Sequence, residues 1–336
     1  MLTEANVIGK KTDWANYITL ADEHETPLLR ILPKGPKPVN VVKHYQADTY
    51  NAPQPNAQVD GKEWDTFKTA GANRVELTAR CQLFAQTAAV SKLAEDVTDT
   101  AGISDELAHE IPKKMTEMAR EMEASAASDQ TAHADDGAKG NQFRSVGAWI
   151  SSTATSDDDK AVAASILPPA AQVTTTATGS QTEDNIKLIL ESMWTQTGST
   201  GTKVAVLGSK AKKMFGSFQF YIPTSASTQS TSRVTQRQEG STTIGNTVDT
   251  YDSDWGRLEL HMSRWNQHPN FTGGSATYYQ WRTYFMNTER WAWCWNQKPT
   301  VYRLPYKGGN YKAAIEAILM FMCLNPIGEG AWKPAS

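Results

Sequence analysis

Cysteine, excess basic charge and long apolar runs are all scarce in this chain of 336 residues. No run of about 18 apolar residues occurs, which argues against a membrane-spanning helix, and the first residues lack the basic and apolar regions of a secretory signal peptide. The three cysteines, Cys81, Cys294 and Cys323, have no metal-site spacing. We therefore expect buried thiols in a reducing compartment, and no disulfide.

The charge balance argues against a general nucleic-acid binder. The formal net charge is -3 and the pI is near 6.1, whereas such proteins usually carry a basic stripe and a high pI. Hydrophobic residues make up 39% of the chain, which is enough for a real core. The composition predicts one large or two medium folded domains.

Recognisable catalytic motifs are missing as well. There is no glycine-rich phosphate loop and no Gly-x-Ser-x-Gly elbow. His24 and His109 each precede a glutamate, but neither has a second histidine four residues further on, so no zinc-protease motif forms. We expect Glu121 and Glu123, and the run 157–159 of three aspartates, to be solvated charges. The sequence therefore predicts a protein that is not an enzyme, with no cofactor and no metal.

Aromatic residues are plentiful, with 11 Trp, 11 Tyr and 9 Phe. Trp291, Trp293 and Trp295 alternate with smaller residues, which places three indoles on one face of a strand. Each Trp buries roughly 150–250 Å² when packed. The row predicts a face that is covered, either by the core of this chain or by a neighbouring one. The alternative is a stacking platform for sugars.

One long amphipathic helix is predicted from Ser104 to Ser128. Ser104 is the expected N-cap, and Pro112 is expected to bend the helix without ending it. The apolar stripe that predicts the helix is formed by Ile103, Leu107, Ile111, Met115, Met118 and Met122.

Other segments are assigned by their periodicity. Residues 12–38, with several prolines, predict an extended arm without a helix. Residues 39–50 and 74–90 predict two strands joined by a long loop, and the stretches 151–182 and 223–246 are polar and of low complexity. The last apolar run, 311–324, fits either a strand or a buried helix, and we favour the strand. The remaining predictions are helices at 183–194 and 209–218, and strands at 203–207, 247–251, 257–265, 278–285 and 290–295.

Three short motifs, in a characteristic order, suggest a family. The arm holds Thr26-Pro27-Leu28-Leu29, and Arg120 to Glu123 lie near the end of the long helix. The turn Tyr251-Asp252-Ser253-Asp254-Trp255-Gly256 precedes a strand and Arg264. Together they resemble the major capsid proteins of tailed bacteriophages with the Hong Kong 97 type fold, over nearly the whole chain.

The resemblance implies an α+β capsid fold with an N-terminal arm (1–38) and an extended hairpin loop (39–91). A peripheral domain (92–182) would hold the spine helix (104–128). An α/β axial domain (183–265) would follow, and return strands (266–336) would complete both domains. The residues implied in assembly are Pro27, Leu28, Leu29, Lys62, Glu63, Trp64, Arg120, Glu123, Arg233, Arg237, Trp255 and Arg264.

The implied function is that of a major capsid protein, which self-assembles through pentamers and hexamers into an icosahedral shell around double-stranded DNA. The shell would be assembled in the host bacterial cytoplasm and become part of the virion. Expected partners are other copies of the chain, a portal and a separate scaffolding protein, with or without a decoration protein. Contact with DNA would be non-specific, and no membrane would be involved. The alternative is a carbohydrate-binding or tail-associated β-rich module that uses the Trp row.

Some members of the family are cross-linked through a Lys-Asn bond aided by a Glu. Lys62, Glu63 and Lys68 lie in the expected loop, but no Asn partner can be aligned. We therefore expect these residues to be ordinary solvated charges. Because the arm begins within a few residues of Met1, we expect no N-terminal scaffolding segment.

Overall fold

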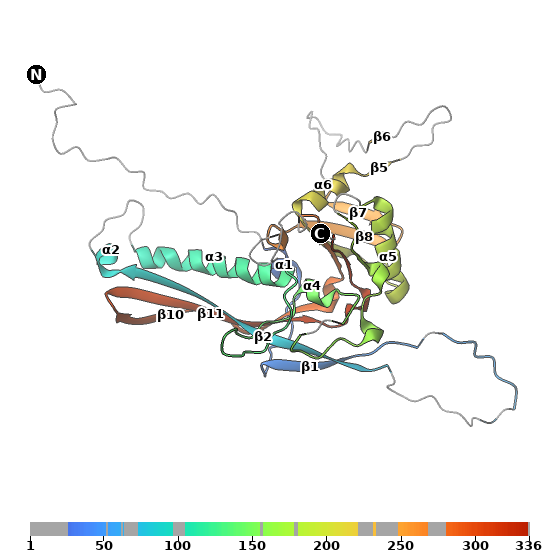
Figure 1. Cartoon of the computed structure of the whole chain (residues 1–336), viewed down its shortest axis with the longest axis horizontal. Coiled ribbons are helices and arrows are strands. Elements are labelled where there is room, and N and C mark those ends of the chain that lie inside the picture. The colour runs from blue at the N-terminus through green and yellow to red at the C-terminus, as the bar shows by residue number, and fades with distance from the viewer. Residues whose placement is uncertain are drawn as a thin grey trace, which may run out of the picture.

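A computed structural model of the chain describes residues 26–51, 53–61, 63, 73–96, 105–154, 157–177, 181–220, 231–232, 248–267 and 280–334. The molecule is elongated (Figure 1): a long sheet with one helix lying along it extends away from a more compact part that contains a second sheet. Lys62, Lys68, Trp64, Arg233 and Arg237 lie outside the described residues.

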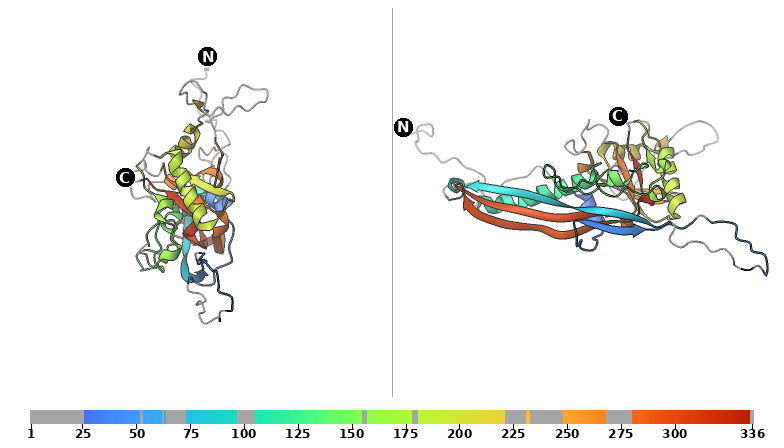
Figure 2. Two further views of the ribbon diagram at one scale, coloured as in Figure 1. Left: turned by 90° about the vertical axis from the view of Figure 1, so that its right-hand side faces the viewer. Right: turned by 60° about the horizontal axis from the view of Figure 1, so that its bottom comes forward.

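The long sheet has four antiparallel strands in the order β1-β2-β11-β10. Its outer part consists of the hairpin of β10 and β11 with β2 paired alongside β11 as far as Ser91, and Figure 2 (right) shows these three long strands side by side. Gly308 and Gly309 form the turn with φ of 70° and 78°, a backbone conformation that favours glycine. The expected strand at the last apolar run is confirmed. The strands are β1 (Val42–Ala47), β2 (Val75–Ser91), β10 (Trp291–Lys307) and β11 (Asn310–Cys323).

Burial along β11 changes character part-way. From Ala313 to Leu319 buried and half-buried residues alternate, so one face of the sheet is covered and the other is not. From Leu319 to Cys323 every residue is buried. Strand β11 is therefore covered on one face from Ala313 onward and on both faces only near the compact part, whereas β10 is exposed from Tyr302 to Lys307.

Helix α3 (Glu106–Ala127) covers the first of these faces, as the amphipathic stripe predicts. Its N-cap is Asp105, whose carboxylate accepts a hydrogen bond from the Ala108 N–H at 2.6 Å. The expectation of Ser104 as N-cap is wrong by one residue, because a carboxylate at this position also complements the helix dipole. Pro112 lies inside the helix, as expected. Met115 is 36% exposed and so lies at the margin of the stripe.

The segment before β1 begins on the α3 side of the sheet, pairs with the edge strand β10, and then lies against the second face near the compact part. It begins with the helix α1 (Pro27–Ile31), so the expectation of an arm without a helix is wrong; Pro27 occupies a first-turn position, where its missing N–H costs nothing. Gly35 then donates its N–H to the Trp293 carbonyl, and the Trp293 N–H returns a bond to the Pro33 carbonyl. A Cβ on Gly35 would lie 2.5 Å from the Cys294 sulfur. The chain can therefore pass this closely only at a glycine.

The second sheet has six strands in the order β3-β12-β9-β4-β8-β7. All five residues of β4 are buried: Ala205 and Leu207 face the cluster beneath α5 and α6, while Val204 and Val206 face the core shared with the long sheet. Both faces of this sheet are thus covered. Its strands are β3 (Val173–Thr174), β4 (Lys203–Leu207), β7 (Thr250–Ser253), β8 (Gly256–Met262), β9 (Thr283–Met286) and β12 (Gly330–Trp332), and its helices are α5 (Glu183–Thr197) and α6 (Ser209–Ser217).

Most element types agree with the sequence, whereas several boundaries do not. β10 continues to Lys307 past Pro299 and Pro305 by means of three irregularities in its pairing. The strand expected to end at Trp265 stops at Met262, and Trp265 begins the short helix η4 (Trp265–Gln267). The polar stretch after residue 150 packs Val162 and Ile166 into the core. The remaining short elements are α2 (Lys92–Asp96), α4 (Val146–Trp149), η2 (Ala164–Ile166), η3 (Ala170–Gln172), η5 (Thr288–Arg290), η6 (Pro326–Gly328), β5 (Gln219–Phe220) and β6 (Thr231–Ser232).

All three cysteines are buried and free, as expected of buried thiols. Burial raises the pKa of Cys81 to about 11 and that of Cys323 well above its ordinary range. Within the described ranges, no helix combines the length and apolar character needed to cross a bilayer.

Candidate assembly surfaces

The arm motif and Glu123 meet inside the molecule. Glu123 is fully buried, and its two carboxylate oxygens accept hydrogen bonds from the N–H groups of Leu28 (2.9 Å) and Leu29 (3.0 Å). A carboxylate at a helix start satisfies donors that have no partner within the helix. Trp293 donates its indole N–H to the Leu28 carbonyl at 3.1 Å. The expectation that Glu123 is a solvated charge is wrong, because it holds α1 against α3.

Arg120 and Arg264 also come together, on an aromatic ring that the sequence analysis assigned to a strand end. The guanidinium carbons of Arg120 and Arg264 lie 5.4 Å and 5.1 Å from the centroid of the Trp265 ring. Such cation–π contacts contribute about 0.5–2 kcal/mol each, depending on exposure. The Arg120 contact joins α3 to the segment that follows β8. Trp265 follows Arg264 directly in the sequence. This adjacency was the one sequence feature that could have indicated a contact between the arginine and the ring.

The turn that contains Trp255 is a tight connection between β7 and β8. Gly256 has φ of 118°, and a Cβ there would lie 2.6 Å from the Thr200 carbonyl oxygen. The buried ammonium of Lys203 donates to the carbonyls of Trp255 (3.1 Å) and Ser199 (3.1 Å). Burial lowers the pKa of Lys203. This turn is therefore held rigidly from within the compact part.

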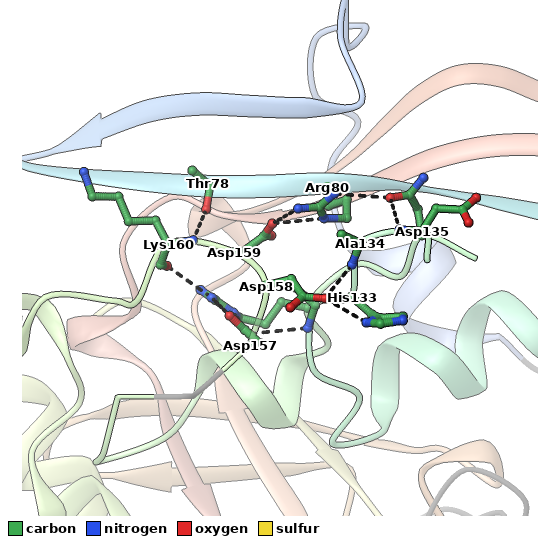
Figure 3. A network of polar contacts seen from close by, with 12 residues as sticks. Thr78, Arg80, His133, Ala134, Asp135, Asp157, Asp158, Asp159 and Lys160 are labelled. Carbon is green, nitrogen blue, oxygen red and sulfur yellow. Dashed lines mark hydrogen bonds and ion pairs between the residues drawn. The ribbon is translucent and has the colours of Figure 1, made fainter. Parts of the chain in front are cut away.

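Two aspartates of the run 157–159 are structural (Figure 3), contrary to the expectation of solvated charges. Arg144 binds Asp157 through two parallel hydrogen bonds, at 2.8 Å and 2.7 Å, and both side chains are almost fully buried. The Arg144 guanidinium also lies 4.5 Å from the Trp149 ring centroid. Planar two-point pairing of this kind fixes orientation as well as charge. An isolated arginine within the apolar run 143–150 was the signal for it.

The rest of this network ties the loop to β2. Asp159 accepts from the Arg80 Nε at 3.1 Å, and the Lys160 N–H donates to the Thr78 hydroxyl at 3.0 Å. Burial raises the pKa of Asp159, an effect that Arg80 opposes. Asp158 is the exposed member of the run; its pKa is lowered by a backbone N–H bond from Ala134 and by His133. The loop after α3 thus continues the cover over the long sheet (Figure 3).

The described residues at the centre of the connection between β1 and β2 are not buried by their own chain. Every described residue from 50 to 63 is exposed, including Tyr50 at 103% and Val59 at 76%. Glu63 belongs to this segment. Figure 1 shows the described part of the segment leading away from the body of the molecule.

A second exposed surface is the uncovered face of the long sheet. We call it the bare face; it comprises Leu83, Tyr302 and Leu304, which are 57%, 43% and 44% exposed, with the half-buried Ala314 and Ile318 and the charged Lys312 and Glu316 beside them. The pairing register places these side chains on the face opposite α3. Large apolar residues gathered on one exposed face usually mark a contact surface.

The Trp row contributes to neither surface. Trp291 and Trp293 are 0% and 1% exposed, and both pack on Phe321 with centroid distances of 5.2 Å and 4.7 Å. Trp295 is half-buried. A platform for sugars needs open indole faces, so the alternative of a carbohydrate-stacking row is wrong.

Such an elongated subunit, with a projecting segment and a bare sheet face, fits the result of the family comparison, in which residues 1–329 match the family described as SU10 major capsid protein. The chain belongs to the SU10 major capsid protein family. As a major capsid protein, it forms the shell of a phage virion. The family is structural, and the described residues bring no three His, Cys, Asp or Glu side chains together as metal ligands.

Solved phage capsid structures show the same fold. A chain of Gordonia phage Cozz has a TM-score of 0.62 at 11% identity and covers 99% of this capsid protein and 93% of its own length. The capsid of a native gene transfer agent particle gives 0.60 at 12% identity, covering 99% and 98%. The capsid of cyanophage P-SCSP1u gives 0.60 at 6% identity, covering 100% and 96%. No curated protein matches the capsid protein.

Proposed function

We propose that this capsid protein assembles through pentamers and hexamers into an icosahedral shell around double-stranded DNA, as a subunit of the Hong Kong 97 type. Its parts would be an arm (1–38), an extended loop (39–91), a peripheral domain (92–182) with spine helix 104–128, an axial domain (183–265) and return strands (266–336). The four-stranded sheet with α3 along it and the covered six-stranded sheet support this division.

The observation that carries the proposal is the exposed connection between β1 and β2. A segment that exposes Tyr50 and Val59 to this degree gains no stability from its own chain. Laid on a neighbouring copy, it would bury apolar surface that no single copy can bury. A head-to-tail contact of this kind generates closed rings when its rotation closes.

The candidate assembly residues would take two roles. Glu63, Lys62 and Trp64 would contact a neighbour directly, and so would Arg233 and Arg237. The others would fix the subunit's shape from inside: Pro27, Leu28, Leu29 and Glu123 at the α1 joint, Arg120 and Arg264 on Trp265, and Trp255 in its turn.

Assembly would take place in the host bacterial cytoplasm, with a portal and a separate scaffolding protein as partners. A decoration protein would be an addition to the shell and not a condition for it. Packaged DNA would be contacted without sequence preference, in line with the acidic net charge.

The test is to measure the mass and shape of the assemblies that the purified protein forms with the scaffolding protein present. Light scattering gives the mass and negative-stain microscopy gives the shape, each at rising protein concentration. We expect rings of five and six subunits, or shells. The double variant Tyr50→Ala/Val59→Ala should lose these assemblies, while its thermal unfolding should change little because both side chains are exposed.

A matched control is Leu188→Ala, which removes an exposed apolar side chain (56% exposed) from α5. It should assemble normally. Unchanged assembly of the double variant would show that the β1–β2 connection is not the contact that builds the rings.

A further inference from the structure

The two sheets are joined by two short connections that lie side by side. Residues 287–290, which include η5, lead from β9 into β10, and residues 324–329, which include η6, lead from β11 into β12. The Leu324 N–H donates to the Arg290 carbonyl at 2.7 Å, so the connections are bonded to each other. Any rotation of one sheet against the other has to distort this junction.

Glu329 lies at the centre of the junction and is fully buried. Its Oε2 accepts the Asn287 N–H at 2.9 Å, which ties the second connection to the first. The buried indole N–H of Trp291 interacts with the carboxyl and favours its ionised form, although neither this nitrogen nor Oε1 has a hydrogen bond of good geometry among the described residues. The carboxyl is therefore held by one well-formed backbone bond and a weaker indole contact, and its side chain is fully buried.

The titratable groups around Glu329 come from three elements. Arg290 from η5 and Lys203 from β4 favour its ionised form, and the buried Cys323 thiol at the end of β11 also lies within its influence. On the α5 side, the groups packed against Gly328 and Gly330 are Thr197, Ile189 and Met193, none of which titrates. Burial outweighs the Trp291 indole, the Asn287 N–H and the two cations, and raises the pKa of Glu329 to about 7.

We propose that Glu329 is a proton-controlled latch between the two sheets: the neutral carboxyl keeps the junction closed, and its ionisation loosens it. The reason is hydration. An ionised carboxylate gains water only when the junction opens, because closing it removes water without supplying a full set of hydrogen-bond donors. The inference rests on the fold of one subunit and is independent of the proposed contacts between subunits.

The test is hydrogen–deuterium exchange of the full-length protein across about pH 5.5 to 8.5, corrected for the intrinsic exchange rate. With a carboxyl that titrates at 4.5 when open and at about 7 when closed, protection of residues 287–290 and 324–331 should fall about thirtyfold over this range. In the Glu329→Gln variant, whose amide stays neutral, protection of these residues should not change with pH. Glu191→Gln, which alters an exposed glutamate on α5, should behave like the parent protein.

Equal pH dependence in the parent and in Glu329→Gln would overturn the latch. A second measurement guards against a variant that is merely altered in folding. Thermal unfolding of the parent and Glu329→Gln should diverge steadily as the pH rises through the same range, whereas a constant offset would also overturn the proposal. Shell formation is not part of either readout, so failure here leaves the proposed assembly contacts untouched.

Discussion

The two sheets of this subunit differ in how much of their apolar surface is covered within the chain. The six-stranded sheet is covered on both faces within the chain, by α5 and α6 on one side and by the shared core on the other. The four-stranded sheet is covered by α3 and the following loop on one face, but its outer half leaves the bare face open. One sheet is complete as a monomer, and the other is complete only on one side. The difference indicates that the six-stranded sheet stabilises the single subunit, whereas the four-stranded sheet offers a surface for contacts with other subunits.

The largest expected effect comes from removing the cover of the long sheet. Arg144→Ala should cost about 4 kcal/mol of unfolding free energy, because it leaves Asp157 buried and unpaired. Urea unfolding at neutral pH measures it. Arg257→Ala removes an exposed pair with Asp252 and should cost less than about 1 kcal/mol. Similar losses for both variants would mean that the network in Figure 3 does not hold the loop to the sheet.

The junction between the sheets should show the next largest effect, with a size that depends on pH. Glu329 has an ordinary pKa of 4.5, raised to about 7 in the folded chain, so its stabilising contribution is complete below 4.5 and is lost as the pH rises through about 7. Glu329→Gln should therefore be more stable than the parent by about 3 kcal/mol at about pH 8. Denaturant unfolding at several pH values measures the difference, which should shrink toward zero below about pH 4.5.

A smaller effect is expected where the arm docks. Glu123→Gln leaves one carbonyl oxygen for two backbone N–H donors, which should cost about 2 kcal/mol. Hydrogen–deuterium exchange of the Leu28 and Leu29 amides should be accelerated more than exchange of the amides in β4, which lies in the other sheet. Glu121→Gln is the matched control, because Glu121 bonds only the half-buried Gln86 among the described residues and should change stability little. Equal effects of the two variants would contradict the docking role of Glu123.

The smallest effect should be on the bare face. Leu304→Ser should change the unfolding free energy by no more than about 0.5 kcal/mol, because Leu304 is 44% exposed. Ile315→Ser, on the covered face of β11, should cost several kcal/mol since Ile315 is fully buried. Thermal unfolding of the two variants compares the faces directly. A large loss for Leu304→Ser would show that this face is already covered within one copy.

Local pattern predicted the elements of both sheets well. The stripe of Leu107, Ile111, Met118 and Met122 predicted α3, and the alternation around the Trp row predicted β10. Helices α5 and α6 and the buried strand β4 also lie where periodicity placed them. Such patterns are readable because each depends on neighbours within one helix turn or one strand.

The joints could not be predicted in the same way, since they bring together residues that are distant in sequence. Asp157 looks like any loop aspartate until Arg144 is placed beside it, and Glu123 looks solvated until α1 is docked. The helix α1 itself has five residues, too few for periodicity to reveal. Glu329 gave no sequence signal, because its burial depends on the crossing of two separate connections.

The order of the strands bears on how the chain is made. β11 lies between β2 and β10 in one sheet, and β9 lies between β12 and β4 in the other. All of these central partners come after residue 282. During synthesis, β2 and β4 therefore leave the ribosome long before the strands that complete their sheets. The nascent chain should therefore expose unpaired strand edges and apolar surface through most of its translation, and should bind chaperones during that time.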